Sequence, residues 1–283
     1  MEIDRSAIEK IIDIAIKEDL GEGDHTSLAV IPSELTGKAQ LIVKQDGIIA
    51  GIEVAKFIFH KIDPKIKFIS FLNDGHSVKK NDIIFRVEGQ VISILKAERI
   101  VLNIMQRMSG IATQTHHYVE KVSGLKTSIL DTRNTAPGMR LLDKYAVKAG
   151  GGKNHRFGLF DMILIKDNHI DFSGGIEQAI KKVHDYLKKN NKKLKIEIEA
   201  RSIADVEVIL KTGGVDRILL DNLSLELTRH AVAIINGRFE TEASGNISLS
   251  NVREYAECGV DYISIGALTH QISSLDLSLK ACS

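Results

Sequence analysis

The feature that most constrains the fold is a series of six short apolar runs in the second half of the chain, each ending in polar or glycine residues. Helix-like stretches such as GIEQAIKKVHDYLKK lie between several of them. Their spacing of roughly 20 to 35 residues is typical of successive strand–helix units in a (β/α) barrel. Six or seven units, fewer than the usual eight, predict an irregular, shortened (β/α) barrel over residues 110–283. The runs are SILDTRN, MILIKDNH, IEIEARS, RILLDN, FETEASGN and YISIGAL.

The first half of the chain has a different texture. Residues 3–17 place apolar side chains on one helical face, and three strand-like runs follow, with the helical pattern IEVAKFIFHKI between the first two. This order predicts an N-terminal α+β sandwich domain over residues 1–109, within an overall α/β fold. We place the boundary near Ser109, where SGIA indicates a break after a helix. A final helix is expected to pack back on the N-terminal domain.

Composition excludes several classes of protein. With 38 basic and 37 acidic residues, the chain has no global field that would attract nucleic acid or an acidic membrane. The N-terminal segment lacks the apolar core of a signal peptide, and no apolar run approaches the roughly 20 residues of a membrane span. The two cysteines, Cys258 and Cys282, form no motif, which suits a reducing compartment. We therefore expect a cytoplasmic protein.

Charged and small residues follow the predicted strands, and the carboxyl ends of barrel strands form the active face. Arginine suits bidentate binding of carboxylates or phosphates, so the cations predict a pocket for a small polyanion. Carboxylates opposite them could hold Mg²⁺ or ribose hydroxyls, and the segments EASGN and SIGAL could cradle a phosphate. The residues expected at this mouth are Arg133, His155, Arg156, Lys166, Glu199, Asp221, Ser244 and Gly266.

Three further patterns have ordinary interpretations. The stretch GHSVKKNDIIFRVEGQV is similar to a biotinyl or lipoyl carrier hairpin, but its turn-like position, VEGQV, lacks the exposed lysine that carriers need. Arg99, Asn103 and Arg107 share one helical face at i, i+4 spacing, which on its own predicts a solvated face. The segment GGGKN lacks the spacing of a Walker motif.

Several motifs, in order along the chain, resemble those of the quinolinate phosphoribosyltransferase family. They are EDLGEGDHTS, AERIVLNIMQRMSGIAT, the long block DTRNTAPGMRLLDKYAVKAGGGKNHRFGLFDMILIKDNH, EIEA, ILLDN, EASGNIS and GVDYISIGALTH. The resemblance covers about residues 8–280. It implies that quinolinate and phosphoribosyl pyrophosphate react with Mg²⁺ to give nicotinate mononucleotide, pyrophosphate and CO₂ for NAD synthesis.

The resemblance also implies roles for individual residues and a homodimer. Arg133, His155, Arg156 and Lys166 would hold the two carboxylates of quinolinate, and Arg99 would reach in from the partner subunit, which replaces the solvated interpretation for Arg99 alone. Glu199 and Asp221 would bind the ribose hydroxyls and the metal, and they form the expected catalytic set with Lys166. The residues expected to receive the 5′-phosphate are Ser244, Gly245, Gly266 and Ala267.

The chain departs from the family pattern at one position. The family usually has T-R-K-T where this chain has Asn134 after Arg133, so a positive charge near the phosphates is missing. We expect Lys148 or Lys153, on either side of the glycine loop Gly150–Gly152, to supply that charge. Asn134 also leaves open a related transferase for another aromatic acid or base, and a barrel that only binds a phosphorylated ligand is a third hypothesis.

Overall fold

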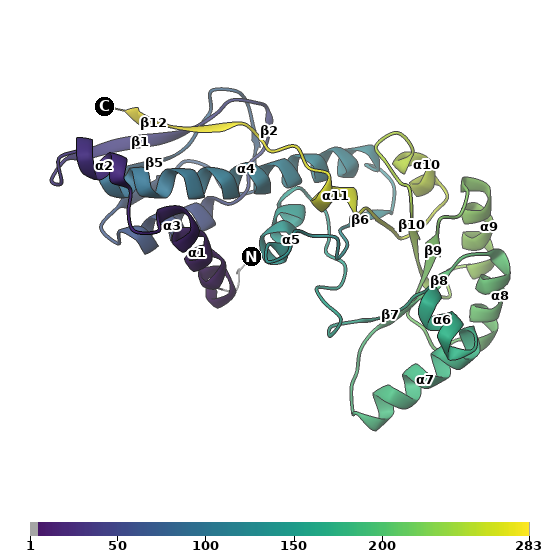
Figure 1. The fold of residues 1–283 in the computed structure, drawn as a ribbon. Coiled ribbons are helices and arrows are strands. Elements are labelled where there is room, and N and C mark those ends of the chain that lie inside the picture. Colours follow the sequence, from purple (N-terminus) through teal and green to yellow (C-terminus); the bar gives the residue numbers. More distant parts are fainter. Residues whose placement is uncertain (1–4, 283) are drawn as a thin grey trace. The chain divides into compact units, whose positions relative to one another are not determined.

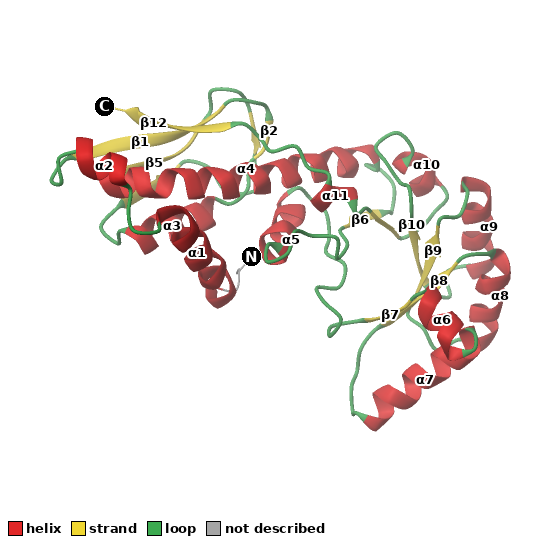
Figure 2. Ribbon diagram, in the orientation of Figure 1, coloured by secondary structure: helices red, strands yellow, loops and turns green. Residues whose placement is uncertain are grey.

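The computed structural model describes residues 5–282 of the 283-residue chain. They form two compact units, and each is described by itself. The first unit contains the described residues up to His116, together with Thr135–Gly151 and the residues from Ala267 on. The second contains His117–Asn134 and Gly152–Gly266. Figures 1 and 2 show their elements.

The first unit is built on an antiparallel sheet with the strand order β12-β1-β5-β3. Phe59 of the helix α3 packs against Phe68 and Phe85 of two strands, with ring centroids 6.0 Å from each. Helices and sheet thus share one apolar core, as the predicted α+β domain requires. The elements are α1 (Arg5–Leu20), α2 (His25–Val30), β1 (Thr36–Val43), β2 (Gly47–Ile48), α3 (Ile52–Ile62), β3 (Lys67–Ser70), β4 (Ser77–Val78), β5 (Ile83–Gln90), α5 (Arg140–Ala149), α11 (Ala267–His270) and β12 (Leu277–Cys282).

The long helix α4 (Val91–Lys121) continues through the segment where the sequence predicted a break. Ser109 Oγ accepts a hydrogen bond from the backbone N–H of Ala50 at 3.0 Å. A Cβ on Gly110 would lie 2.3 Å from the carbonyl oxygen of Ser273. The predicted break is therefore wrong, because the small residues allow close packing and do not end the helix. β5 passes directly into α4, so VEGQV is not the hairpin turn of a carrier domain.

The last described element is the strand β12, where the sequence prediction placed a helix. β12 pairs antiparallel with β1, with Leu279 opposite Leu41. Leu277 and Leu279 are buried and Ser278 between them is partly exposed, which is the alternation of a strand with one covered face. The expected packing on the N-terminal sheet occurs, but backbone hydrogen bonding provides it.

The second unit is a six-stranded parallel sheet with the order β6-β11-β10-β9-β8-β7. Figure 1 shows helices α7, α8 and α9 along one face of this sheet. Among the described residues, no strand pairing joins β6 to β7, so hydrogen bonds do not close the barrel. Each of the six apolar runs in the sequence contains one strand of this sheet, which confirms the strand pattern of the predicted shortened barrel. The elements are β6 (Ser128–Leu130), β7 (Ile163–Ile165), α6 (Asp167–Ser173), α7 (Ile176–Lys189), β8 (Ile196–Ala200), α8 (Ile203–Thr212), β9 (Arg217–Asp221), α9 (Leu225–Ile235), β10 (Glu240–Ser244), α10 (Val252–Glu257) and β11 (Tyr262–Ser264).

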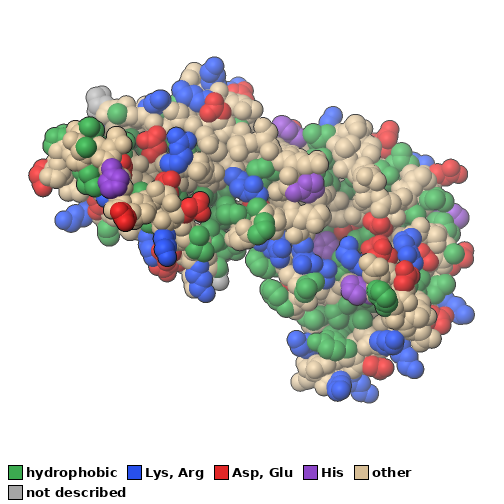
Figure 3. All heavy atoms as spheres, in the orientation of Figure 1, with side chains coloured by type: hydrophobic (Ala, Val, Ile, Leu, Met, Phe, Trp, Pro, Cys, Tyr) green, Lys and Arg blue, Asp and Glu red, His purple; other side chains and the backbone are tan. Residues whose placement is uncertain are grey.

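The exposed charges of both signs are mixed over the face drawn in Figure 3. This mixture matches the nearly balanced count of basic and acidic residues. Across residues 5–282, the helices include none with the length and apolar character needed to cross a bilayer.

Candidate active site

The interior of the parallel sheet is lined by polar side chains at three successive levels. Alternate residues of a strand point to opposite faces, so Ile196 and Ile198 face away from Glu197 and Glu199. Residues two apart along a strand are about 6 to 7 Å apart, which separates the levels. The levels are named by position along each strand. The top level contains the inward-facing residues nearest the strand ends, Glu199, Asp221 and Ser244, and the middle level contains the residues two positions earlier on β8 and β10, Glu197 and Glu242. The lowest level contains the first residues of β9, β10 and β11, which are Arg217, Glu240 and Tyr262.

The top level brings together three residues that the sequence predicted to meet. Glu199 and Asp221 end the neighbouring strands β8 and β9, and Lys166 follows β7. Lys166 Nζ lies 4.0 Å from Glu199 Oε2. Burial raises the pKa of Glu199 and the charge of Asp221 raises it further, whereas Lys166 opposes the rise. Two carboxylates and an ammonium group therefore share one end of the sheet.

The turn after β10 lies beside Asp221. Gly245 has φ +95°, and a Cβ there would lie 2.2 Å from Asn222 Oδ1, so a larger residue would be strained and would displace the Asn222 amide. The Asn222 amide donates to Asp221 Oδ2 at 2.7 Å and accepts from Asn246 Nδ2 at 3.0 Å. Asn222 thus joins the β9 carboxylate to the β10 turn. Asn222 was not among the expected site residues, although its position directly after a strand-ending Asp is visible in the sequence.

Two guanidinium groups lie close together on the segments after β6 and before β7. Burial lowers the pKa of Arg156, and the positive charge of Arg133 lowers it further. Arg156 Nη1 also donates to the carbonyl oxygen of Met162 at 3.3 Å. Paired guanidinium groups favour an anionic ligand, because an anion between them relieves their repulsion. Asn134 beside them is exposed, and its N–H donates to Thr132 Oγ1.

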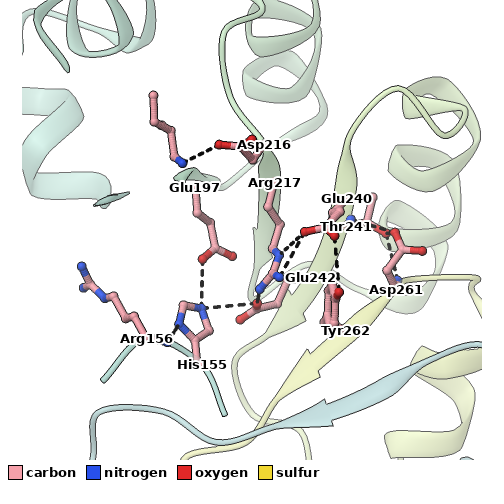
Figure 4. Close-up of polar contacts among 11 residues, drawn as sticks. His155, Arg156, Glu197, Asp216, Arg217, Glu240, Thr241, Glu242, Asp261 and Tyr262 are labelled. Carbon is pink, nitrogen blue, oxygen red and sulfur yellow. Dashed lines mark hydrogen bonds and ion pairs between the residues drawn. The ribbon is translucent and has the colours of Figure 1, made fainter. Parts of the chain in front are cut away.

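His155 lies deeper, at the middle level of the sheet interior (Figure 4). Its Nε2 is 2.9 Å from Glu197 Oε2 and 3.4 Å from Glu242 Oε2. Its Nδ1 accepts a hydrogen bond from the backbone N–H of Arg156 at 2.7 Å. Both ring nitrogens therefore have partners within the protein. His155 was expected among the ligand-binding cations, whereas the two buried carboxylates that contact it were not expected.

The charges in this cluster are strongly coupled. Burial opposes a positive charge on His155, but the hydrogen bonds and charges of Glu197 and Glu242 outweigh burial and raise its pKa to about 9. Burial and the charge of Glu242 raise the pKa of Glu197 to about 7. The N–H of Arg156 disfavours a proton on Nδ1, since two N–H groups would then face each other. His155 Nε2 therefore carries the proton that faces Glu197 and Glu242, and Arg217 Nη1 lies 2.8 Å from Glu242 Oε2.

Lys153, one of the two lysines expected to replace the missing charge at Asn134, has a partner of its own. Its Nζ lies over the Tyr262 ring, 6.0 Å from the centroid, and Arg217 Cζ lies 4.0 Å from the same centroid. Tyr262 belongs to the lowest level of the interior. This position does not support compensation by Lys153, which stays a prediction.

Other predicted residues belong to the first unit. Arg99 and Lys148 are exposed on α4 and α5, and Ala267 is the first residue of α11. Local structure favours glycine at two positions of the loop. Gly151 has φ +91°, and a Cβ on Gly150 would lie 2.3 Å from the Ala112 carbonyl oxygen.

The solvated face predicted for Arg107 is wrong. Its Nε and Nη2 donate to the two oxygens of Asp143, each at 2.8 Å, and Nη2 also reaches the Thr269 carbonyl oxygen at 3.2 Å. Asp143 is fully buried, so the helix periodicity that placed Arg107 beside Arg99 gave no sign of this long-range partner.

Two groups of residues could hold a metal ion. The ligand atoms of His155, Glu197 and Glu242 lie within 4.8 Å of one another, but Arg217 and the imidazole already balance these carboxylates. Glu199 and Asp221 offer hard oxygen ligands that lie close enough for the charge of Asp221 to affect Glu199. Mg²⁺ prefers one or two carboxylates together with substrate phosphates, so the second group fits it better.

Comparison with known proteins identifies the family. Residues 24–109 match the N-terminal domain of quinolinate phosphoribosyl transferase and residues 111–280 match its C-terminal domain. The chain is 47% identical over 285 residues to quinolinate phosphoribosyltransferase [decarboxylating] 1b of Nicotiana tabacum, covering 95% of this chain and 81% of that protein. It is 39% identical over 272 residues to a probable nicotinate-nucleotide pyrophosphorylase [carboxylating] of Bacillus subtilis, covering 96% and 92%.

A solved structure supports the same assignment. NadC from Streptococcus pyogenes superimposes with a TM-score of 0.94 at 35% identity, covering 100% of both chains. The match extends over both units, and the open parallel sheet with charged residues at its strand ends agrees with the motifs that the sequence shares with this family. The chain therefore belongs to the quinolinate phosphoribosyltransferase family.

Proposed function

We propose that the protein transfers a phosphoribosyl group from phosphoribosyl pyrophosphate to quinolinate and decarboxylates the product, giving nicotinate mononucleotide for NAD biosynthesis. The observation that carries the proposal is the pair of opposed charge sets in the second unit. Arg133, Arg156 and Lys166 form the cationic set, and Glu199 and Asp221 form the acidic set. The family assigns the reaction, and these residues supply the charges that it requires.

The reaction first forms a bond between the quinolinate nitrogen and C1′ of the ribose. The nitrogen lone pair attacks C1′ while the C1′–oxygen bond breaks, and pyrophosphate leaves with that electron pair. The bond from C2 of the ring to its carboxylate then breaks, CO₂ leaves, and C2 takes a proton from solvent. Decarboxylation follows transfer, because the pyridinium ring accepts the electron pair on C2 better than neutral pyridine does.

Each charge set has a task in this sequence. Arg133, Arg156 and Lys166 bind the two carboxylates and align the ring nitrogen with C1′, and such alignment can contribute up to ~7 to 11 kcal/mol. Glu199 and Asp221 bind the ribose hydroxyls and stabilise the positive charge that develops on the ribose as pyrophosphate departs. The 4.0 Å distance between Lys166 Nζ and Glu199 Oε2 supports a carboxylate pocket next to the ribose site.

The proposal includes a phosphate site and a metal. Ser244 ends β10, and Gly245 and Gly266 lie just after β10 and β11, at the end of the sheet where a 5′-phosphate would bind. Ala267 and a compensating Lys148 remain predictions from the resemblance and the sequence. Glu199 and Asp221 would hold Mg²⁺, which when bound neutralises charge on the pyrophosphate. A homodimer with Arg99 contributed across the interface, and a cytoplasmic location, are also proposed.

Product analysis by mass spectrometry tests the proposal. The purified protein is incubated with phosphoribosyl pyrophosphate and Mg²⁺, and with either quinolinate or nicotinate. We expect nicotinate mononucleotide from quinolinate alone, and no product after chelation of Mg²⁺. Turnover of a different aromatic acid in place of quinolinate would favour the related transferase that Asn134 left open, and turnover of none would favour a binding protein.

A further inference from the structure

The middle level of the sheet interior lies directly beneath the proposed substrate residues and has no role in the mechanism above. Glu197 precedes Glu199 by two residues on β8, and Glu242 precedes Ser244 by two residues on β10. Both side chains are fully buried. Buried carboxylates are unfavourable unless charged or polar partners compensate them. Their presence under the site therefore calls for an explanation beyond core packing.

Both carboxylates converge on one nitrogen of His155. Nε2 lies 2.9 Å from Glu197 Oε2 and 3.4 Å from Glu242 Oε2, so the ring is bound from two strands at once. Figure 4 shows the imidazole between these carboxylates. A ring held in this way has a fixed orientation, and its other nitrogen points in a defined direction.

The backbone around His155 is held separately by Asp131, which follows β6 and is fully buried. Asp131 Oδ1 accepts the backbone N–H of His155 at 2.8 Å, and Oδ2 accepts from Asn154 Nδ2 at 2.5 Å. The segment is thus bound through its backbone to the β6 side and through the imidazole to β8 and β10. Arg156 is the next residue along the chain.

The second ring nitrogen connects this support to Arg156. Nδ1 accepts the backbone N–H of Arg156 at 2.7 Å, so the ring orientation set by the carboxylates also sets the position of the Arg156 backbone. The guanidinium group of Arg156 lies near that of Arg133, and like charges separate unless the protein holds them together. A small displacement of such a group can reduce the rate about 100-fold.

We propose that Glu197 and Glu242 are positioning residues for the quinolinate pocket, acting through His155 on Arg156. The imidazole connects the two carboxylates, through Nε2, with the Arg156 backbone, through Nδ1. The choice of quinolinate as the substrate rests on the proposed function. The contacts from Glu197 and Glu242 through His155 to Arg156 exist in the protein without any ligand. It assigns to Glu197 and Glu242 an effect on the binding of the dicarboxylate and none on the binding of phosphoribosyl pyrophosphate.

Steady-state kinetics of Glu197→Gln and Glu242→Gln test the substrate effect. Each substrate is varied in turn, and Glu240→Gln is the matched control, because Glu240 lies on the same face of β10 and also bonds Arg217 but does not contact His155. We expect KM for quinolinate to rise about 10-fold or more in both test variants. KM for phosphoribosyl pyrophosphate should stay within about twofold in all three. An unchanged KM for quinolinate, or equal rises in both KM values, would overturn the inference.

Hydrogen exchange measured by NMR in the unliganded protein separates this inference from the proposed function. The Arg156 amide should be protected in the wild-type protein and in Glu240→Gln, and should exchange at least about 10-fold faster in Glu197→Gln. An Arg156 amide that exchanges like an unprotected loop amide in the wild-type protein would overturn the inference, and this test needs no variant. Protection that survives in folded Glu197→Gln would overturn it equally. Loss of quinolinate turnover in the wild-type protein would refute the proposed function and leave this result standing.

Discussion

Gly245→Ala tests whether the turn after β10 supports Asp221, the carboxylate that is proposed to bind the ribose hydroxyls. A residue other than glycine at φ +95° costs about 1 to 2 kcal/mol in backbone strain. The new Cβ would also lie 2.2 Å from Asn222 Oδ1 and 2.5 Å from its Cγ, so the Asn222 amide must move. That movement breaks the 2.7 Å hydrogen bond from Asn222 to Asp221.

The size of the effect follows from that hydrogen bond. A hydrogen bond to a charged group contributes about 1.5 to 3 kcal/mol, and partial exposure of Asp221 places its value at or below the lower end. About 1.4 kcal/mol corresponds to a tenfold change. We therefore expect kcat/KM for phosphoribosyl pyrophosphate to fall about 10-fold in Gly245→Ala, with a smaller effect on KM for quinolinate.

Gly174→Ala is the matched control. Gly174 has φ +93°, and the nearest atom to its added Cβ is 3.9 Å away, so this variant has the backbone strain without the collision. Both variants should lose the stability that the backbone strain costs, and only Gly245→Ala should lose activity with phosphoribosyl pyrophosphate. If the two variants have equal kinetics, Asn222 does not support Asp221 in the way described.

Three further predictions concern stability, the pocket and pH. Asp143→Ala removes the buried carboxylate that binds the partly exposed Arg107 and should lower the free energy of unfolding in urea by about 3 kcal/mol, whereas Glu257→Gln, in an exposed i, i+4 pair, should lower it by less than about 0.5 kcal/mol. Lys166→Gln should reduce kcat/KM for quinolinate by about 100-fold or more, and Lys182→Gln, at an exposed lysine, should leave it unchanged. Burial raises the pKa of Asp261, but hydrogen bonds from Lys126 and Thr241 outweigh burial and lower it. A carboxyl group with a lowered pKa in the folded state stabilises the protein at pH values above its unfolded-state pKa of about 4, and this stabilisation is lost as the pH falls below that value. Between about pH 5 and 2, thermal melts should therefore show a smaller loss of stability for Asp261→Asn than for the wild-type protein.

Sequence periodicity predicted the parallel sheet because its strands and helices are local features. All six apolar runs contain strands, and the residues at their ends meet as expected for Lys166, Glu199 and Asp221. The C-terminal strand was missed because a short run of alternating leucines forms a strand only when it pairs with β1, which is far away in the sequence. Ser109 and Gly110 were misread for a related reason, since their small size serves contacts with distant backbone.

The candidate site was only partly accessible from sequence. The cations and carboxylates of the top level follow strand ends, where chemistry is expected in this architecture. Glu197 and Glu242 lie two residues earlier on the same strand faces, so the period-2 rule could have placed them beneath the site. Their contact with His155 could not be foreseen, because it depends on how a loop folds into the sheet interior.

The most direct test of the central claim uses quinolinate labelled with ¹³C in the carboxylate at C2. Labelled CO₂ and nicotinate mononucleotide are measured together, with and without phosphoribosyl pyrophosphate. The account predicts equal amounts of the two products, and neither of them when phosphoribosyl pyrophosphate is absent. Labelled CO₂ without phosphoribosyl pyrophosphate, or a mononucleotide that retains the label, would contradict it.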